Sequence, residues 1–148
     1  MIGRRQFITL LGGAAASWPI VASAQEPKKP WRVGLLPLGS PSNAYDQSLV
    51  EAFRKGLRQT GLVESRDVML DVVWTTGNPE QAVKALLERG VDLLVSSGTS
   101  ASLAAKLHAS ALPIVFISVG NPIGIGLVEN LARPGGNMTG FTRFWGSA

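Results

Sequence analysis

The stretch Leu112-Pro-Ile-Val-Phe-Ile117 decides the fold, because its four consecutive large apolar residues are typical of a strand that is buried on both faces. Strands of this kind occur in parallel sheets that helices cover from both sides. A second apolar strand, Val91-Asp-Leu-Leu-Val95, precedes it, and residues 99–110 between the two have helical periodicity. Two buried strands joined by a helix indicate an α/β domain.

The same alternation of strand and helix extends in both directions along the chain. Strands are predicted at residues 32–37, 68–74 and 138–141, and helices at residues 46–61, 80–89 and 127–132. In the 99–110 helix, we expect Leu103, Ala104 and Leu107 to face inward. The imperfect alternation of residues 68–74 favours an edge strand. The pattern predicts a doubly wound parallel sheet of flavodoxin-like order 2-1-3-4-5, with helices on both faces.

The first 24 residues are typical of an export signal rather than of a folded domain. Arg4 and Arg5 begin the segment, an apolar run rich in Gly and Ala follows, and Ala22-Ser23-Ala24 supplies the small residues of a signal-peptidase site. The paired arginines resemble a twin-arginine signal. A membrane helix is the alternative, but the run is shorter than the roughly 20 residues that span a bilayer. We predict cleavage before Gln25, a linker over residues 25–31 and a periplasmic location.

The composition favours a folded protein and excludes several classes of function. Apolar residues make up 45% and charged residues 16% of the chain, as in globular domains. Loss of the leader lowers the net charge from +4 to +2, and no basic stripe remains for nucleic acid. The absence of cysteine excludes disulfides, thiolate metal ligands and the acylated cysteine of a lipoprotein. We expect a soluble protein that needs no metal or other cofactor.

Polar, uncharged residues follow three of the predicted strands at their carboxyl ends. In a doubly wound sheet, ligands bind beyond these ends, where the strand order reverses. The predicted ligand-binding residues are Ser40 and Ser42 after the first strand, Ser97, Gly98 and Thr99 after the third, and Gly120, Asn121 and Pro122 after the fourth. Hydroxyls, an amide and free N–H groups suit a small polar or zwitterionic ligand, since a carboxylate at a helix amino terminus gains about 0.3–1 kcal/mol.

The same residues also have a purely structural interpretation. Ser42 or Asn43 could cap the 46–61 helix, and Ser97 or Thr99 the 99–110 helix. Catalysis has less support, because the chain has no P-loop motif and its single histidine, His108, is predicted on a helix surface. No cluster of histidines or acidic residues has metal-ligand spacing. The sequence therefore predicts a binding site without catalytic groups.

Several motifs together resemble the ABC-transporter substrate-binding proteins of the tryptophan/tyrosine type. The most specific is Ala132-Arg-Pro-Gly-Gly-Asn-Met-Thr-Gly140, and Ser97-Gly98-Thr99 and Gly120-Asn121-Pro122 add to it. The resemblance implies a type I periplasmic-binding-protein fold, in which two α/β lobes enclose a ligand for delivery to a membrane permease. It also implies amino acids, aromatic ones above all, as ligands. Members of the family often carry Asp where Asn121 stands.

The length of the chain suits one lobe of such a protein rather than two. Residues 32–142 are predicted to form the amino-terminal lobe, and residues 143–148 an irregular tail where the chain would enter the hinge. We interpret the sequence as a solute-binding protein truncated to about its first lobe. Two alternatives stay open: a remnant without transport activity, and a small exported α/β enzyme domain.

Overall fold

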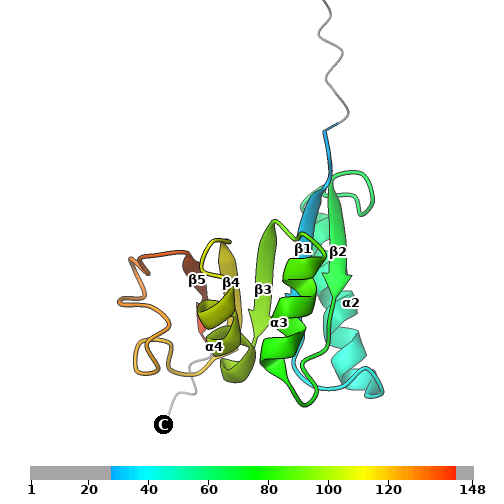
Figure 1. The fold of residues 1–148 in the computed structure, drawn as a ribbon. Helices are drawn as coiled ribbons and strands as arrows, with labels where there is room; N and C mark the ends of the chain where they lie inside the picture. Colours follow the sequence, from blue (N-terminus) through cyan, green and yellow to red (C-terminus); the bar gives the residue numbers. More distant parts are fainter. Residues whose placement is uncertain (1–27, 143–148) are drawn as a thin grey trace, which may run out of the picture.

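Five parallel strands form the sheet of the computed structural model, which describes residues 28–142 (Figure 1). The strands are β1 (Trp31–Leu36), β2 (Val68–Val72), β3 (Leu93–Ser97), β4 (Ile114–Val119) and β5 (Met138–Thr142), and the helices are α2 (Ala44–Gln59), α3 (Pro79–Glu88) and α4 (Thr99–His108). The order β2-β1-β3-β4-β5 confirms the predicted topology, with β2 at an edge. The predicted leader, residues 1–24, and the predicted tail, residues 143–148, lie outside the described residues.

Helices cover the two faces of the sheet unequally. On one face, α3 and α4 pack over a core that includes Leu86, Leu94 and Phe116. On the other, α2 packs through Val50 against Val33 and neighbouring strand residues. Figure 1 shows α2 behind β1 and β2, and α3 and α4 in front of the sheet. Burial of each large apolar side chain stabilises the fold by about 1.5–3 kcal/mol.

The inward face of α4 differs from the prediction. Leu103 is 41% exposed and Leu107 69% exposed, so neither leucine belongs to the core. The buried residues of the helix are Ala101, Ser102, Ala104 and Ala105. Small side chains allow the helix to approach α3 and the sheet closely, and this close approach turns the larger leucines toward solvent.

The predicted short helix at residues 127–132 is wrong, because this part of the chain forms bends and irregular loop instead. The Asn130 side chain accepts hydrogen bonds from the N–H groups of Ala132 (2.7 Å) and Arg133 (3.4 Å), which gives an Asx turn where a helical turn was expected. Leu127 and Val128 are nevertheless buried against the core on the α4 side. Their apolar character therefore reflects burial of a loop and not helical periodicity.

Within residues 28–142, none of the helices combines the length and the apolar character needed to cross a membrane.

Candidate functional site

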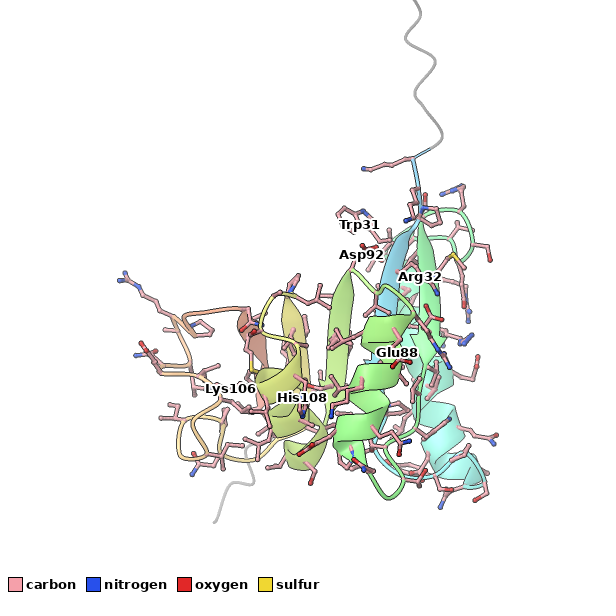
Figure 2. All side chains as sticks on the ribbon, viewed as in Figure 1. Trp31, Arg32, Glu88, Asp92, Lys106 and His108 are labelled. Carbon is pink, nitrogen blue, oxygen red and sulfur yellow. The ribbon has the colours of Figure 1, made fainter. Side chains whose placement is uncertain are left out.

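The carboxyl ends of β1, β3 and β4 lie along one edge of the sheet, at the bottom of Figure 1. All eight predicted ligand-binding residues lie at this edge: Ser40 and Ser42 in the β1–α2 loop, Ser97, Gly98 and Thr99 at the β3–α4 junction, and Gly120, Asn121 and Pro122 after β4. Figure 2 places the labelled residues Arg32 and Asp92 near the opposite end of the sheet. The polar, uncharged loops therefore all lie at the carboxyl edge.

Asp46 organises the loop between β1 and α2. Its carboxylate accepts a hydrogen bond from the Ser40 N–H (2.8 Å) and lies so close to Gly39 that a Cβ there would stand 2.1 Å from the Asp46 Oδ2. The hydroxyls of Ser40 and Ser42 lie 2.8 Å apart and bond to each other. This loop is held by its own polar groups, so Ser40 and Ser42 already have partners before any ligand binds.

The start of α2 is capped by one of the two residues considered for that role. The Asn43 Oδ1 accepts hydrogen bonds from the N–H groups of Tyr45 (2.8 Å) and Asp46 (3.2 Å). Asn43 is therefore the cap, and Ser42 is not. Helix α3 is capped in the same way, because the Asn78 Oδ1 accepts from the Gln81 N–H (3.0 Å). Both caps occupy N–H groups that a ligand would otherwise find free.

Helix α4 begins differently, because no side chain caps its amino terminus. The N-cap position is Gly98, with φ +84°, and its N–H donates to the Ile117 carbonyl (2.9 Å). The next two residues, Thr99 and Ser100, are exposed. Neither Ser97 nor Thr99 takes the capping role that the sequence allowed. The first turn of α4 therefore presents backbone N–H donors and the positive end of the helix dipole at the carboxyl edge.

A buried pair of serines supports the first turn of α4. The Ser102 hydroxyl donates to the Gly98 carbonyl (2.7 Å) and lies 2.9 Å from the Ser96 hydroxyl, and both side chains are fully buried. This pair was not predicted from the sequence. A signal existed, since Ser96 directly follows the apolar run of residues 91–95 and Ser102 lies among the small residues of α4. The pair fixes the position of Gly98 relative to β3.

The end of β4 contains a strained residue, and a turn follows the strand. Ser118 has φ +59° and lies at an irregularity in the pairing of β4 with β5, between Ile117 and Val119. This strain could not be read from the sequence, although an unusual backbone conformation at a binding edge is a common feature of ligand sites. The Asn121 Oδ1 accepts from the Gly124 N–H (2.9 Å), so its side chain also supports a local turn. Pro122 is buried, whereas Gly120 and Asn121 are exposed.

The single histidine of the chain, His108, pairs with an acidic residue. His108, in the last turn of α4, has its Nε2 3.2 Å from a carboxylate oxygen of Glu80 at the start of α3. It is half-buried between the two helices rather than fully on the surface as predicted. Among residues 28–142, no group of three or more His, Cys, Asp or Glu side chains could hold a metal ion.

The carboxyl edge is open rather than enclosed. An apolar hollow of about 40 Å³ borders Ser97 and is lined by Leu38, Phe53 and Ile117 among others. A larger hollow, about 380 Å³, lies between α4 and the segment that leads to β5, where Lys106 and Glu129 line it. It contains none of the eight predicted residues. The larger hollow therefore does not coincide with the loops whose polar groups suit a ligand.

A parallel sheet of this order, with uncharged polar loops at its carboxyl edge, defines an α/β lobe of the kind that periplasmic binding proteins contain. Residues 42–143 match the family model described as ABC transporter substrate binding protein. The chain belongs to this family. No curated protein sequence matches it.

Solved structures agree with this assignment. The ABC domain from Streptococcus pneumoniae in complex with L-Trp is 27% identical, with a TM-score of 0.65 over 76% of this chain and 38% of that one. A conserved domain protein from Vibrio cholerae is 26% identical, with a TM-score of 0.70 over 78% and 40%. At 21% identity, a ligand-free, open substrate-binding protein with adhesive properties from Clostridium difficile shares the fold, with a TM-score of 0.68 over 77% and 39%. The chain thus spans about two fifths of the length of these structures.

Proposed function

We propose that this chain is the amino-terminal lobe of a solute-binding protein that serves an ABC importer, and that it binds a small polar ligand with a carboxylate, such as an amino acid. The observation that carries the proposal is the amino terminus of α4, which no side chain caps and which opens at the carboxyl edge of the sheet. Carboxylates bind favourably at such a terminus because free N–H groups and the helix dipole both attract negative charge.

The surroundings of this terminus suit a ligand that also has an apolar part. Leu38 is 57% exposed and lies beside Gly98. Thr99 and Ser100, in the first turn of α4, are exposed and carry hydroxyls. An aromatic amino acid combines a carboxylate with a large apolar side chain. The L-Trp complex of the Streptococcus pneumoniae domain supports this choice of ligand class.

Transport requires more than this lobe. The chain covers about two fifths of the related structures, and we propose that a second lobe closes over the carboxyl edge and encloses the ligand. The paired arginines and the Ala22-Ser23-Ala24 motif support export to the periplasm, where the closed protein would deliver its ligand to a membrane permease. The tests below can also show that the chain is a remnant without transport activity, or that it is an enzyme domain.

The proposal is tested by removing a single N–H donor from α4 while the helix is kept. Thr99 is the first helical residue after Gly98, and Thr99→Pro deletes its N–H at a position where proline is well tolerated. Because Thr99→Pro also deletes the hydroxyl, it is compared with Thr99→Ala, which deletes the hydroxyl alone, and the difference between the two variants isolates the N–H. The matched control is Ala44→Pro, which deletes the equivalent N–H of the capped helix α2. We expect Thr99→Pro to lower the affinity for a bound amino acid by roughly tenfold, as for loss of a hydrogen bond to a charged group. Ala44→Pro should leave the affinity unchanged.

The titration is followed by NMR, which detects weak binding. Equal affinities for the wild type and Thr99→Pro would contradict a carboxylate at α4. Equal losses in the two variants would point instead to a general effect of proline on the loops. Circular dichroism checks that each variant keeps its helices.

A further inference from the structure

The strand β5 is the outermost strand on one side of the sheet, and within residues 28–142 no strand pairs with its outer side. It pairs in parallel with β4 on one side, and it is the last strand in the order β2-β1-β3-β4-β5. The Ile114 N–H donates to the Asn137 carbonyl (2.9 Å), which fixes the alternation along β5. Backbone groups of Thr139 and Phe141 therefore face β4, and those of Met138, Gly140 and Thr142 face outward. These outward groups form a template for another strand.

The two edges of the sheet differ in charge. The edge strand β2 contains Asp71, which bonds to Arg32 (2.9 Å) and lies 3.7 Å from Arg89. Charges of this kind protect an edge against pairing with other molecules. The strand β5, Met-Thr-Gly-Phe-Thr, contains no charged residue, and none lies between Gly135 and Asn137 before it. The five residues of β5 themselves therefore place no like charges opposite each other when two copies pair.

Within residues 28–142, no helix covers the face of β5 on the α2 side. Phe141 is 72% exposed there, and Thr139 is exposed beside it. Helix α2 packs on the core around Val33, Val50 and Val95, toward the other edge. The turns that precede β5 pack on the opposite face, because Leu127, Val128 and Met138 belong to the core under α3 and α4. An open edge and an uncovered aromatic ring therefore meet on one strand.

We propose that β5 pairs with β5 of a second copy of this chain, antiparallel, about a twofold axis at Gly140. In this register Gly140 lies opposite its own counterpart, and Met138 lies opposite Thr142. Every outward-facing residue of one copy then faces an outward-facing residue of the other, so all of their N–H and C=O groups bond. The two five-stranded sheets join into one sheet of ten strands.

The side chains agree with this register. Phe141 lies opposite Thr139 of the other copy, which is a favourable aromatic to β-branched pair. The two Phe141 rings are diagonal neighbours, within reach of each other across the strands. At the centre, Gly140 packs tightly on β4, where a Cβ would stand 2.0 Å from the Phe116 carbonyl oxygen. A pairing through one strand of five residues is small for a protein interface, so we expect the dimer to be weak and to depend on concentration.

The experiment is sedimentation velocity of the purified chain over a range of concentrations. Thr142→Pro removes one outward N–H and leaves the bonds to β4 intact. Thr139→Lys and Thr139→Glu place a charge on the exposed face, opposite Phe141 of the partner copy. Met69→Lys, in β2, is the control, because it adds the same charge to an exposed residue at the other edge. Circular dichroism confirms that each variant is folded.

We expect the wild type and Met69→Lys to form dimers with equal affinity, and Thr142→Pro to weaken the dimer by at least roughly tenfold. Each charged variant should be monomeric alone, and an equal mixture of Thr139→Lys and Thr139→Glu should recover the dimer, because the opposite charges are diagonal neighbours. A wild type that stays monomeric at every concentration overturns the proposal. So does a dimer that Thr142→Pro leaves intact, since that result would mean stacking of the uncovered faces instead of edge pairing.

Discussion

The side chain of Leu38 lies against Gly98, with its Cδ1 3.2 Å from the position that a Cβ on Gly98 would take. This contact joins the loop after β1 to the start of α4. Gly98 also has φ +84°, a conformation that residues with a side chain adopt at a cost. Space and backbone conformation together require glycine where the free N–H groups of α4 begin.

A side chain at position 98 should therefore destabilise the protein. We expect Gly98→Ala to lower the free energy of unfolding by about 1–3 kcal/mol, measured by urea denaturation. The control is Gly56→Ala, because Gly56 is helical and a Cβ there has no atom within 4 Å. That substitution should raise stability by roughly 0.5–1 kcal/mol. A Gly98→Ala variant as stable as the wild type would contradict this account of the site.

The buried serine pair should behave as a unit. Ser102→Ala leaves the Ser96 hydroxyl and the Gly98 carbonyl without this partner, and we expect a loss of about 1–3 kcal/mol. The double variant Ser96→Ala/Ser102→Ala should lose less than the two single losses combined, because no buried hydroxyl is then left unpaired. Urea denaturation of all four proteins gives this coupling. Strict additivity would show that the two hydroxyls do not interact.

The carboxylate of Asp67 should titrate below its ordinary range. Its hydrogen bond from Arg66 is the largest cause of the lowered pKa, and the Val63 N–H is the second. A carboxyl with a lowered folded-state pKa stabilises the fold above its unfolded-state pKa, and this contribution is lost as the pH falls through the folded-state pKa. NMR titration should place the midpoint below that of the urea-unfolded chain. In Arg66→Ala the midpoint should rise only in part, because Val63 still donates.

Export should depend on the paired arginines. Replacement of Arg4 and Arg5 by Lys keeps the charge but removes the feature on which the twin-arginine pathway depends, so precursor should accumulate in the cytoplasm. Cell fractionation with amino-terminal sequencing measures this. A periplasmic protein that begins at Gln25 in the variant, at the wild-type level, would argue for the other export route.

The fold could be predicted from the sequence because apolar runs and helical stripes carry its main features. The strand order and the edge position of β2 are confirmed. The predictions were wrong where apolar residues are buried without lying in a helix, or lie in a helix without being buried. Leu127 and Val128 are buried in a loop, and the small residues of α4 replace Leu103 and Leu107 in the core. Strands β3 and β4 each lie two residues further along than predicted, because Ser96 and Ser97 continue β3, and Ser118 and Val119 continue β4, despite the serine hydroxyls.

The candidate site could be located from the sequence, but the roles within it could not. Loop composition was sufficient to place eight residues at the carboxyl edge. Whether a polar residue caps a helix or stays free depends on backbone geometry. Asn43 caps α2, while Thr99 leaves α4 uncapped. The positive φ of Ser118 is likewise a property of the folded chain and not of its composition.

The site as described should bind weakly by itself. Its loops face solvent, so each hydrogen bond to a ligand replaces one to water and contributes only about 0.5–1.5 kcal/mol. We expect dissociation constants on the order of millimolar for amino acids, as measured by isothermal titration of the purified chain. Micromolar or tighter binding by a monomer would show that this lobe is a complete binding module and needs no second lobe.

The most direct test of the account is an NMR titration of the isotope-labelled chain with L-tryptophan and a panel of other amino acids. If the first turn of α4 holds the ligand carboxylate, the largest changes in amide chemical shift should fall on residues 98–101, followed by the loops after β1 and β4. Changes should be absent when the carboxylate is amidated. Changes centred on the hollow that Lys106 and Glu129 line, or no saturable change with any ligand, would contradict the proposed site.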